Sequence, residues 1–239
     1  GACWALSASS AMQDRWCINY PAGQTRTAPI LSADQITGCC GGFTCIGCAG
    51  CNGGQLAPTW HFASKHGIVS GGNYGDDQTC APYTLPPCEH HVPGSRPTCK
   101  EGEYKTPACP RTCKNSASFS GDKHYFQNGY SLPTVQSMME DVYQHGSIQV
   151  AFTVYQDFLT YKSGVYVWDG TSPALGGHAV SIVGWGTTAD GTEYWTVRNS
   201  WNTDWGNNGY FNIARGRDEC GIEADANAGI PDYSRTPSA

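Results

Sequence analysis

The sequence predicts an α+β protein built from two lobes, and three features of its 239 residues lead to this prediction. Helix signals are concentrated in the first third, the middle is rich in Gly, Pro and Cys, and strand-like runs fill the last third after one further helix. Segregated helices and strands are typical of α+β folds, in which each group builds its own layer. A cleft between two such lobes is a natural place for an active site.

The first predicted lobe is helical and covers about residues 3–130. A helix is predicted over residues 3–17, which are rich in helix-tolerant side chains. Ser32 followed by Gln35 is typical of a capping box and predicts a short helix directly after it. A third helix is predicted over residues 56–66, with a glycine to end it.

The middle of the chain, about residues 70–130, is predicted to be loops. It contains a Pro-Pro pair, scattered Gly and Pro, and five cysteines, with little periodicity. We expect disulfides to hold this segment in place, because it has little apolar pattern with which to pack.

The second predicted lobe covers about residues 131–230 and is rich in strands. A helix over residues 133–145, ended by Gly146, introduces it. We expect both lobes to form one unit over residues 1–230 and the polar tail 231–239 to fray. The strand-like segments are 148–155, 164–168, 178–185, 193–198 and 209–215.

Composition limits the compartment and the partners. Thirteen cysteines favour an oxidising location, so we expect a secreted protein or one of lysosomes and endosomes. The net charge is −6 with no run of Lys or Arg, which disfavours a nucleic-acid or anionic-membrane partner. No apolar stretch reaches the roughly 18 residues that a spanning helix needs.

Cys3 is the candidate nucleophile. It lies at the start of a predicted helix, where backbone N–H groups and the helix dipole favour thiolate over thiol. A nucleophilic Cys needs a base, and the base needs an orienting group. His178 follows Gly176 and Gly177, which leave space beside it, and Asn199 ends the next predicted strand. The Asn amide would fix the tautomer of the imidazole.

Each of these residues has a simpler explanation when taken alone. A Cys is more often packing or half of a disulfide, a His at a strand start is more often structural, and Asn-Ser-Trp fits an ordinary turn. The order and context of the three residues are what favour catalysis.

That context resembles the papain family of cysteine peptidases, and within it the cathepsin B-like group. The similarity extends essentially from Cys3 to Pro231. The matching segments are Gly1-Ala2-Cys3-Trp4-Ala5, Cys51-Asn52-Gly53-Gly54, Pro87-Cys88-Glu89-His90-His91-Val92, 157–166, Gly176-Gly177-His178-Ala179, 199–206 and Cys220-Gly221-Ile222-Glu223.

The resemblance implies a two-lobe fold with an antiparallel, β-barrel-like second lobe and an occluding loop over residues 88–99. It implies a peptidase in which Cys3 is the nucleophile, His178 the general base and then acid, and Asn199 the group that orients the base. Trp201 would shield the His–Asn pair from water.

Substrate contacts also follow from the resemblance. Gly53, Gly54 and Gly177 would offer open backbone to an extended peptide, since side chains there would block it. A tight turn is the simpler explanation of the glycine pair, and both explanations can hold.

Three further side chains would face the substrate or hold the loop. His90 and His91 would bind its terminal carboxylate, unless they are ordinary exposed loop histidines. Asp225 would lie at the floor of the pocket for the P2 side chain, the second residue before the scissile bond, unless it is a solvated surface Asp. Arg96 would pin the occluding loop to Asp204, unless it is an ordinary surface Arg.

The resemblance implies endopeptidase activity together with release of C-terminal dipeptides, and no metal or other cofactor. Partners would be peptide and protein substrates, the protein's own propeptide and cystatin-like inhibitors. The implied disulfides are Cys39–Cys109, Cys40–Cys45, Cys80–Cys113 and Cys88–Cys99.

The chain departs from the family at its start. The family has a segment before the catalytic Cys that supplies a Gln to the oxyanion hole and partners for the cysteines matching Cys17 and Cys51, and Cys48 is additional. We therefore expect a fragment, because the chain begins at a motif. One alternative is an inactive peptidase-like fragment or binding protein, and another is a zinc module on Cys45, Cys48 and Cys51, whose spacing is ligand-like.

Overall fold

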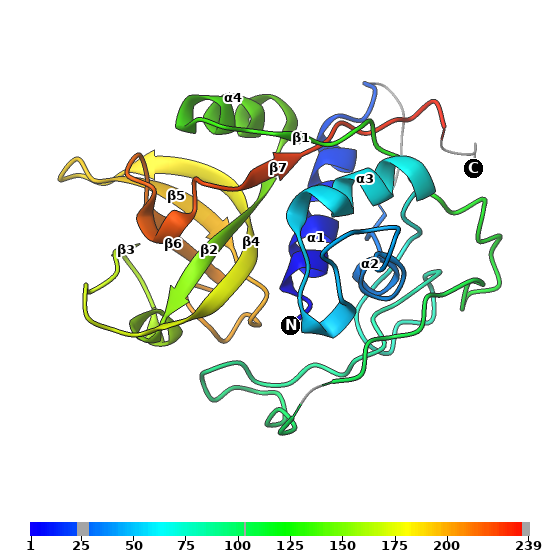
Figure 1. Ribbon diagram of the computed structural model, residues 1–239, viewed down its shortest axis with the longest axis horizontal. Helices are drawn as coiled ribbons and strands as arrows, with labels where there is room; N and C mark the ends of the chain where they lie inside the picture. The colour runs from blue at the N-terminus through cyan, green and yellow to red at the C-terminus, as the bar shows by residue number, and fades with distance from the viewer. Residues whose placement is uncertain (23–28, 103, 236–239) are drawn as a thin grey trace.

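A computed structural model of the chain shows two lobes side by side, one of helices and one built on a sheet (Figure 1). The structure describes residues 1–22, 29–102 and 104–235. The α+β class predicted from the sequence is confirmed, with helices first and most strands after residue 145.

The helical lobe is built on α1 (Cys3–Ile18), α2 (Ala33–Cys39), the short 3-10 turn η1 (Gly50–Asn52) and α3 (Leu56–His66). The Ser32 hydroxyl accepts the backbone N–H of Gln35 at 3.0 Å and so caps α2. Helix α3 ends at Gly67, whose φ of +68° is a left-handed conformation that favours glycine.

The predicted reciprocal capping box of α2 is wrong in one half. The side chain of Gln35 does not return to Ser32; it donates to the carbonyl of Gly67 and accepts from the N–H of Val69. Two buried backbone groups of the next segment needed partners, and this tertiary demand outweighs the local cap.

The second lobe is a seven-stranded sheet in the order β1-β7-β2-β4-β5-β6-β3. Neighbouring strands are antiparallel, except that β3 and β6 are parallel. Helix α4 (Val135–His145) lies against this lobe, capped by Thr134 and ended by Gly146, with η2 (Gln156–Thr160) and η3 (Glu219–Gly221) in the connections. The strands are β1 (Tyr130–Ser131), β2 (Ile148–Tyr155), β3 (Val165–Tyr166), β4 (Ala174–Thr187), β5 (Glu193–Arg198), β6 (Tyr210–Ala214) and β7 (Ala226–Ala228).

The described residues of the middle of the chain run over the surface of the helical lobe and form no regular structure apart from isolated bridges, as the Gly- and Pro-rich sequence predicts. The described residues form four disulfides, and their pairs are those that the resemblance implies. They are Cys39–Cys109, Cys40–Cys45, Cys80–Cys113 and Cys88–Cys99.

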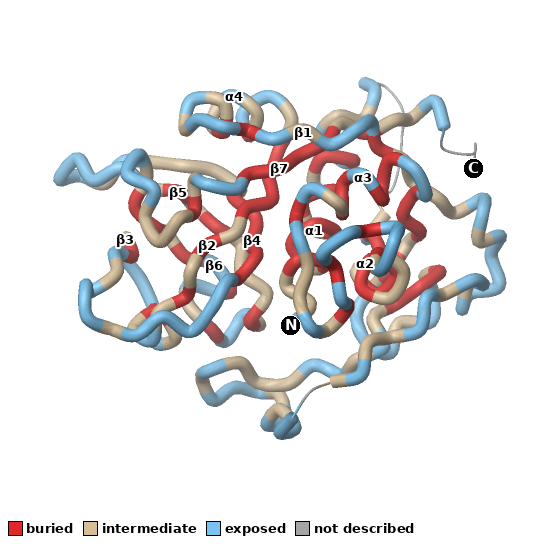
Figure 2. Tube along the Cα trace, viewed as in Figure 1, coloured by how far each residue is buried: buried red, intermediate tan, exposed pale blue. Residues whose placement is uncertain are grey.

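Each lobe has its own hydrophobic core, and α1 lies at the boundary between the cores (Figure 2). The β-lobe core contains Phe152, Phe158 and Trp195. The helical core contains Trp4 and, from strand β4, Ala179. One face of the sheet therefore packs directly on α1, and the two lobes meet along that helix.

The described part of the tail, residues 231–235, makes several contacts with the helical lobe. The Tyr233 hydroxyl donates to the carbonyl of Trp16 at 2.7 Å, and Arg235 lies over the ring of Tyr125 and donates to the carbonyl of Ser64. Aromatic and cationic side chains find partners on the helical lobe, although the segment is polar in composition. Residues 236–239 lie outside the described residues.

Candidate active site

Helix α1 presents Cys3 in its first turn, with an N-terminus that has no side-chain cap. The N-cap residue is Ala2, which offers no oxygen to the first backbone N–H groups. An uncapped helix start leaves N–H donors directed outward, together with the positive end of the helix dipole. Cys3 is partly buried and packs against the cluster that includes Trp4 and Ala179. The nucleophile candidate thus lies where α1 meets β4.

His178 lies on β4 and is hydrogen-bonded to Asn199, the residue that follows β5. The distance from His178 Nε2 to Asn199 Oδ1 is 2.8 Å. The backbone N–H of Ser200 donates to the same Oδ1 at 2.8 Å, which identifies that atom as the amide oxygen. Since this oxygen can only accept, Nε2 carries the proton and Nδ1 is left as the basic nitrogen.

Trp201 covers this pair. Its ring is stacked on the His178 ring with centroids 4.8 Å apart and is itself only 7% exposed. His178 is 8% exposed, and burial lowers its pKa to about 4, partly opposed by the hydrogen bond to Asn199. The imidazole is therefore held in its neutral form, which is the form that can accept a proton.

The loop over residues 88–99 crosses to the β lobe beside this site. Asn202 Nδ2 donates to the carbonyl of Cys88 at 2.6 Å, and Arg96 pairs with Asp204 at 3.1 Å. The loop is thus attached to the segment that contains Trp201 by one partly buried hydrogen bond and one partly exposed ion pair.

Both loop histidines lie against Trp201. The His91 ring meets it edge-on at 4.5 Å between centroids, and the His90 ring is parallel to it at 6.2 Å. Burial, followed by the charges of His91 and His178, lowers the pKa of His90 to about 4. Burial and then His178 also lower the pKa of His91. Three imidazoles thus share one indole, and their cationic forms repel one another.

The three candidate substrate-binding glycines differ in their surroundings. A side chain on Gly53 or Gly177 would meet no other atom within 4 Å, and Gly53 has a φ of +111°. A side chain on Gly54 would lie 2.4 Å from the ring of Trp4. Gly53 and Gly177 therefore leave open space, whereas at Gly54 a side chain would collide with Trp4 at the start of the nucleophile helix.

Asp225 directly precedes the first residue of β7 and is level with the base across the sheet. Its carbonyl accepts the N–H of Ala151, and Ala151 pairs in register with Ala179, which follows His178. Two strand spacings, about 10 Å, therefore separate Asp225 from Ala179. The Asp225 side chain is exposed and accepts a hydrogen bond from Asn227 Nδ2 at 2.6 Å.

Comparisons with known proteins identify the family. The family description "Papain family cysteine protease" matches residues 1–230. The chain belongs to the papain family of cysteine proteases. It is 44% identical over 238 residues to "Cathepsin B-like cysteine proteinase 6" of Caenorhabditis elegans, covering 97% of this chain and 60% of that protein. It is 42% identical over 235 residues to "Cathepsin B-like cysteine proteinase" of Schistosoma japonicum, covering 96% of this chain and 66% of that protein.

Solved structures of the papain family resemble the fold. The proCathepsin B S9 of Trypanosoma congolense superposes with a TM-score of 0.78 at 35% identity, over 97% of this chain and 69% of that one. The proform of the ragweed pollen cysteine protease Amb a 11 gives a TM-score of 0.66 at 25% identity, over 97% of this chain and 59% of that one. The chain thus spans about 60–70% of the length of these papain-family relatives.

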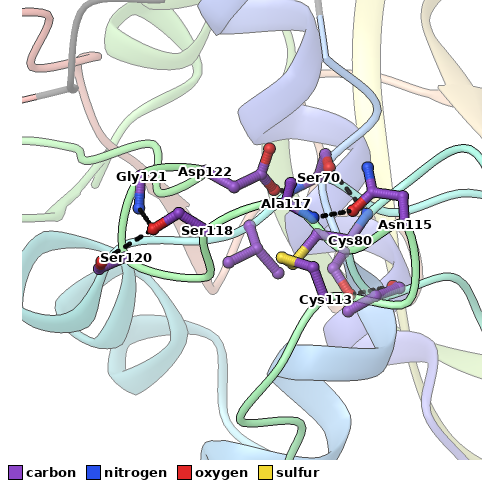
Figure 3. The surroundings of a disulfide bond; sticks show 12 residues. Ser70, Cys80, Cys113, Asn115, Ala117, Ser118, Ser120, Gly121 and Asp122 are labelled. Carbon is purple, nitrogen blue, oxygen red and sulfur yellow. Dashed lines mark hydrogen bonds between the residues drawn. A yellow bond between two sulfur atoms is a disulfide. The ribbon is translucent and has the colours of Figure 1, made fainter.

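Metal binding by the cysteines finds little support in this member of the papain family. Cys45 is bonded to Cys40, so the zinc module considered on Cys45, Cys48 and Cys51 lacks one of its thiolates. Cys80, Cys113 and Asp122 bring ligand-type atoms within 4.8 Å of one another, but the two sulfurs form a disulfide (Figure 3). The Asp122 carboxylate instead accepts the backbone N–H of Ser70.

Among the described helices, none combines the length and the apolar character needed to cross a bilayer.

The sequence patterns did not single out two residues near the site. Gln149 on β2 and Ser181 on β4 are buried and hydrogen-bonded to the first turns of α1. A polar residue in an otherwise apolar strand was the available signal for each.

Proposed function

We propose that the protein hydrolyses peptide bonds through a thioester on Cys3. The observation that supports this most directly is the fixed tautomer of His178, because it supplies a neutral, oriented base at the junction with the uncapped start of α1. Membership of the papain family is the second support.

In the proposed reaction, His178 Nδ1 takes the proton of the Cys3 thiol, and the sulfur attacks the scissile carbonyl. Backbone N–H groups at the start of α1 stabilise the oxyanion of the tetrahedral intermediate. The imidazolium then protonates the leaving amine, which leaves an acyl group on sulfur. Water attacks the thioester with His178 again as base, and the thiol is regenerated.

Asn199 and Trp201 act on the base in this scheme. Asn199 accepts a hydrogen bond from Nε2–H throughout, so that Nδ1 remains the nitrogen that exchanges protons with Cys3 and the leaving amine. The stacked indole of Trp201 excludes water from the His–Asn hydrogen bond and thereby strengthens it.

We further propose that the 88–99 loop makes the enzyme a dipeptidyl carboxypeptidase as well as an endopeptidase. Both loop histidines lie against Trp201 and therefore at one end of the site. A substrate carboxylate arriving there would convert one or both imidazoles to cations and form charge-assisted hydrogen bonds with them. The loop would leave room for about two residues beyond the scissile bond, as the family resemblance implies.

Substrates, partners and location follow the same proposal. Gly53, Gly54 and Gly177 would provide backbone for an extended peptide, and Asp225 would face its P2 side chain. The solved proforms among the relatives support a propeptide as an intramolecular partner, and the family resemblance implies cystatin-like inhibitors as further partners. Thirteen cysteines and four disulfides support a lysosomal, endosomal or secreted location.

Active-site labelling tests the central claim. The purified protein is treated with a thiol-directed epoxide while peptide hydrolysis is followed, and the modified cysteine is identified by peptide mapping. Modification of Cys3 in step with loss of activity is expected, and Cys3→Ser should abolish both. Loss of activity with Cys3 unmodified would refute the assignment.

A further inference from the structure

The side chain of Gln149 joins β2 to the first turn of α1. It is 0% exposed. Its Nε2 donates to the carbonyl of Trp4 at 2.7 Å and to the hydroxyl of Ser7 at 2.9 Å, while its Oε1 accepts the Nε1–H of Trp60 at 3.0 Å. Both amide hydrogens and the amide oxygen are therefore engaged, and the contacts connect the β lobe with α1 and α3.

Ser181 makes a second connection from the neighbouring strand. It is the register partner of Gln149 in the β2–β4 pair and is 1% exposed. Its hydroxyl donates to the carbonyl of Ser7 at 3.0 Å. Gln149 and Ser181 thus hold adjacent carbonyl and hydroxyl groups of one helix turn from two adjacent strands.

These connections lie near both proposed reacting groups, on the same helix and the same strand. Trp4 directly follows Cys3 on α1, and Ser181 is three residues after His178 on β4. A strand rises about 3.3 Å per residue, so Ser181 is about 10 Å along β4 from the base. A helix rises 1.5 Å per residue, which places Ser7 about 6 Å along α1 from the nucleophile.

The far end of α1 is attached to the β lobe in a different way. Arg15 is 0% exposed, pairs with Asp141, and donates to the carbonyl of Ser147 at 2.7 Å. That charged contact holds the lobes together independently of Gln149 and Ser181. At the nucleophile end the contacts are neutral, so they add no charge beside the thiol and imidazole.

We propose that Gln149 and Ser181 form a neutral latch that sets the position of the Cys3 thiol relative to the His178 imidazole. Both are positioning residues, because they act through α1 and β4 and touch no reacting atom. The proposal rests on the proposed function, in which Cys3 and His178 are the reacting pair. Since a displacement of 1 Å can lower a rate about a hundredfold, two hydrogen-bonded anchors this close to both groups are expected to control the rate.

The test compares two buried glutamines. Gln149→Met removes the latch with little change in volume. Gln35→Met is the matched control, because Gln35 is 2% exposed and its amide bonds two backbone groups of the helical lobe, away from the catalytic pair. Both variants should lower the melting temperature. Ser181→Ala is a milder second probe, with Ser9→Ala as its control, since the Ser9 hydroxyl bonds only within α1.

The readout is the rate of alkylation of Cys3 by iodoacetamide, measured by mass spectrometry of the Cys3 peptide. In the wild type we expect alkylation at pH 5.5 to be nearly as fast as at pH 9.5, because transfer of the Cys3 proton to the neutral His178 forms a thiolate–imidazolium pair well below the ordinary pKa of a thiol. Gln149→Met should lower the ratio of the two rates at least tenfold and kcat by roughly ten- to a hundredfold. Ser181→Ala should lower both less, and the two control variants should keep the ratio within about twofold.

Two outcomes would overturn the latch. The first is a Gln149→Met protein that loses stability like Gln35→Met but keeps the wild-type alkylation ratio, since Gln149 would then be structural only. The second is an unchanged ratio and kcat in folded Ser181→Ala, which decides the matter if Gln149→Met does not fold. A wild-type Cys3 with no fast alkylation at pH 5.5 would instead overturn the proposed function, and the latch with it.

Discussion

The Oδ1 of Asn199 accepts two hydrogen bonds at 2.8 Å, one from the ring of His178 and one from the backbone N–H of Ser200. The second bond prevents the amide from rotating, and the first then fixes which nitrogen of the imidazole carries the proton. A carboxylate at the same place would fix the tautomer too, but it would also stabilise the imidazolium. An amide orients the base without adding a charge.

Asn199→Ala should therefore lower kcat by roughly ten- to a hundredfold with little change in KM. The imidazole would lose its orienting acceptor but keep its stacking on Trp201. Steady-state kinetics on a peptide substrate measures this. Ser200→Ala is the control, because it keeps the backbone N–H, and it should retain wild-type kcat. Equal activity of Asn199→Ala and the wild type would contradict the orienting role.

The loop histidines should separate the two modes of attack. Replacing both His90 and His91 by Ala should lower dipeptide release from a substrate with a free C-terminus by at least tenfold. Cleavage of a blocked internal substrate should fall by less than threefold, since no terminal carboxylate is bound there. Parallel assays of the two substrates test this, and an equal loss of both activities would show that the histidines are structural.

Binding of the terminal carboxylate should also depend on pH. Burial lowers the pKa of His90 to about 4 in the free protein, and a bound carboxylate would raise it again, so binding takes up a proton. Affinity should then rise as the pH falls from the ordinary value of 6.5 toward about 4, by up to tenfold per pH unit for one proton.

The measurement is the inhibition constant of a dipeptide product between pH 4 and pH 8. The same dipeptide with an amidated C-terminus is the control, and its inhibition should not strengthen on acidification. An inhibition constant that is flat with pH for both compounds would exclude proton-linked capture.

The ion pair of Arg96 and Asp204 should govern how firmly the loop is held. Its side chains are 31% and 32% exposed, so the pair contributes roughly 0.2–1 kcal/mol. Arg96→Ala should thus raise the ratio of internal cleavage to dipeptide release by about two- to fivefold, and less so in high salt. Glu193→Ala is the control, because it breaks the ion pair of Glu193 on β5 with Arg215, the residue after β6. A ratio unaffected by Arg96→Ala would mean that the contact of Asn202 with Cys88 suffices.

The helices were predicted well, because a helix is started and ended by residues close to it in the sequence. The glycines after α3 and α4 end those helices as expected, and the segment 148–155 has the bounds of β2. Strand β4 is longer than predicted, since pairing with β2 extends it back through the glycines before His178. Strand β7 was missed, because three residues of Ala and Asn carry no strand pattern and pair only through tertiary contacts.

The site was predictable only in part for a similar reason. The residue types and their order, Cys3, His178 and Asn199, indicate a nucleophile, a base and an orienting group. The family resemblance assigns these roles to the three residues. Neither indicates that Gly54 packs under Trp4 or that Gln149 reaches across to α1. Such contacts join residues far apart in the chain, and their partners are backbone carbonyls and rings that leave no pattern in the sequence.

Asp225 is expected to select the P2 side chain. It directly precedes β7, the strand next to β2, and lies about 10 Å from Ala179, which follows the base. Its side chain is exposed and forms no ion pair with any described residue. A carboxylate at the floor of a pocket can form a charge-assisted pair with a guanidinium, and a short Asp reaches less far than Glu would. We therefore expect Phe to be preferred at P2 and Arg to be tolerated, with a water bridging the shorter acid to the substrate.

Asp225→Ala should lower the Arg-to-Phe ratio of kcat/KM by roughly tenfold, which corresponds to about 1.4 kcal/mol. Asp225→Asn is the sharper variant, because the amide oxygen can still accept the hydrogen bond from Asn227 while the charge is lost. Asp225→Glu should raise the ratio, since the longer side chain reaches the guanidinium directly. Asp190→Ala, in the exposed turn between β4 and β5, is the control for a general effect of negative charge. If Asp225→Ala, Asp225→Asn and Asp190→Ala all leave the ratio unchanged in active protein, Asp225 lies outside the pocket and P2 selection belongs to other residues.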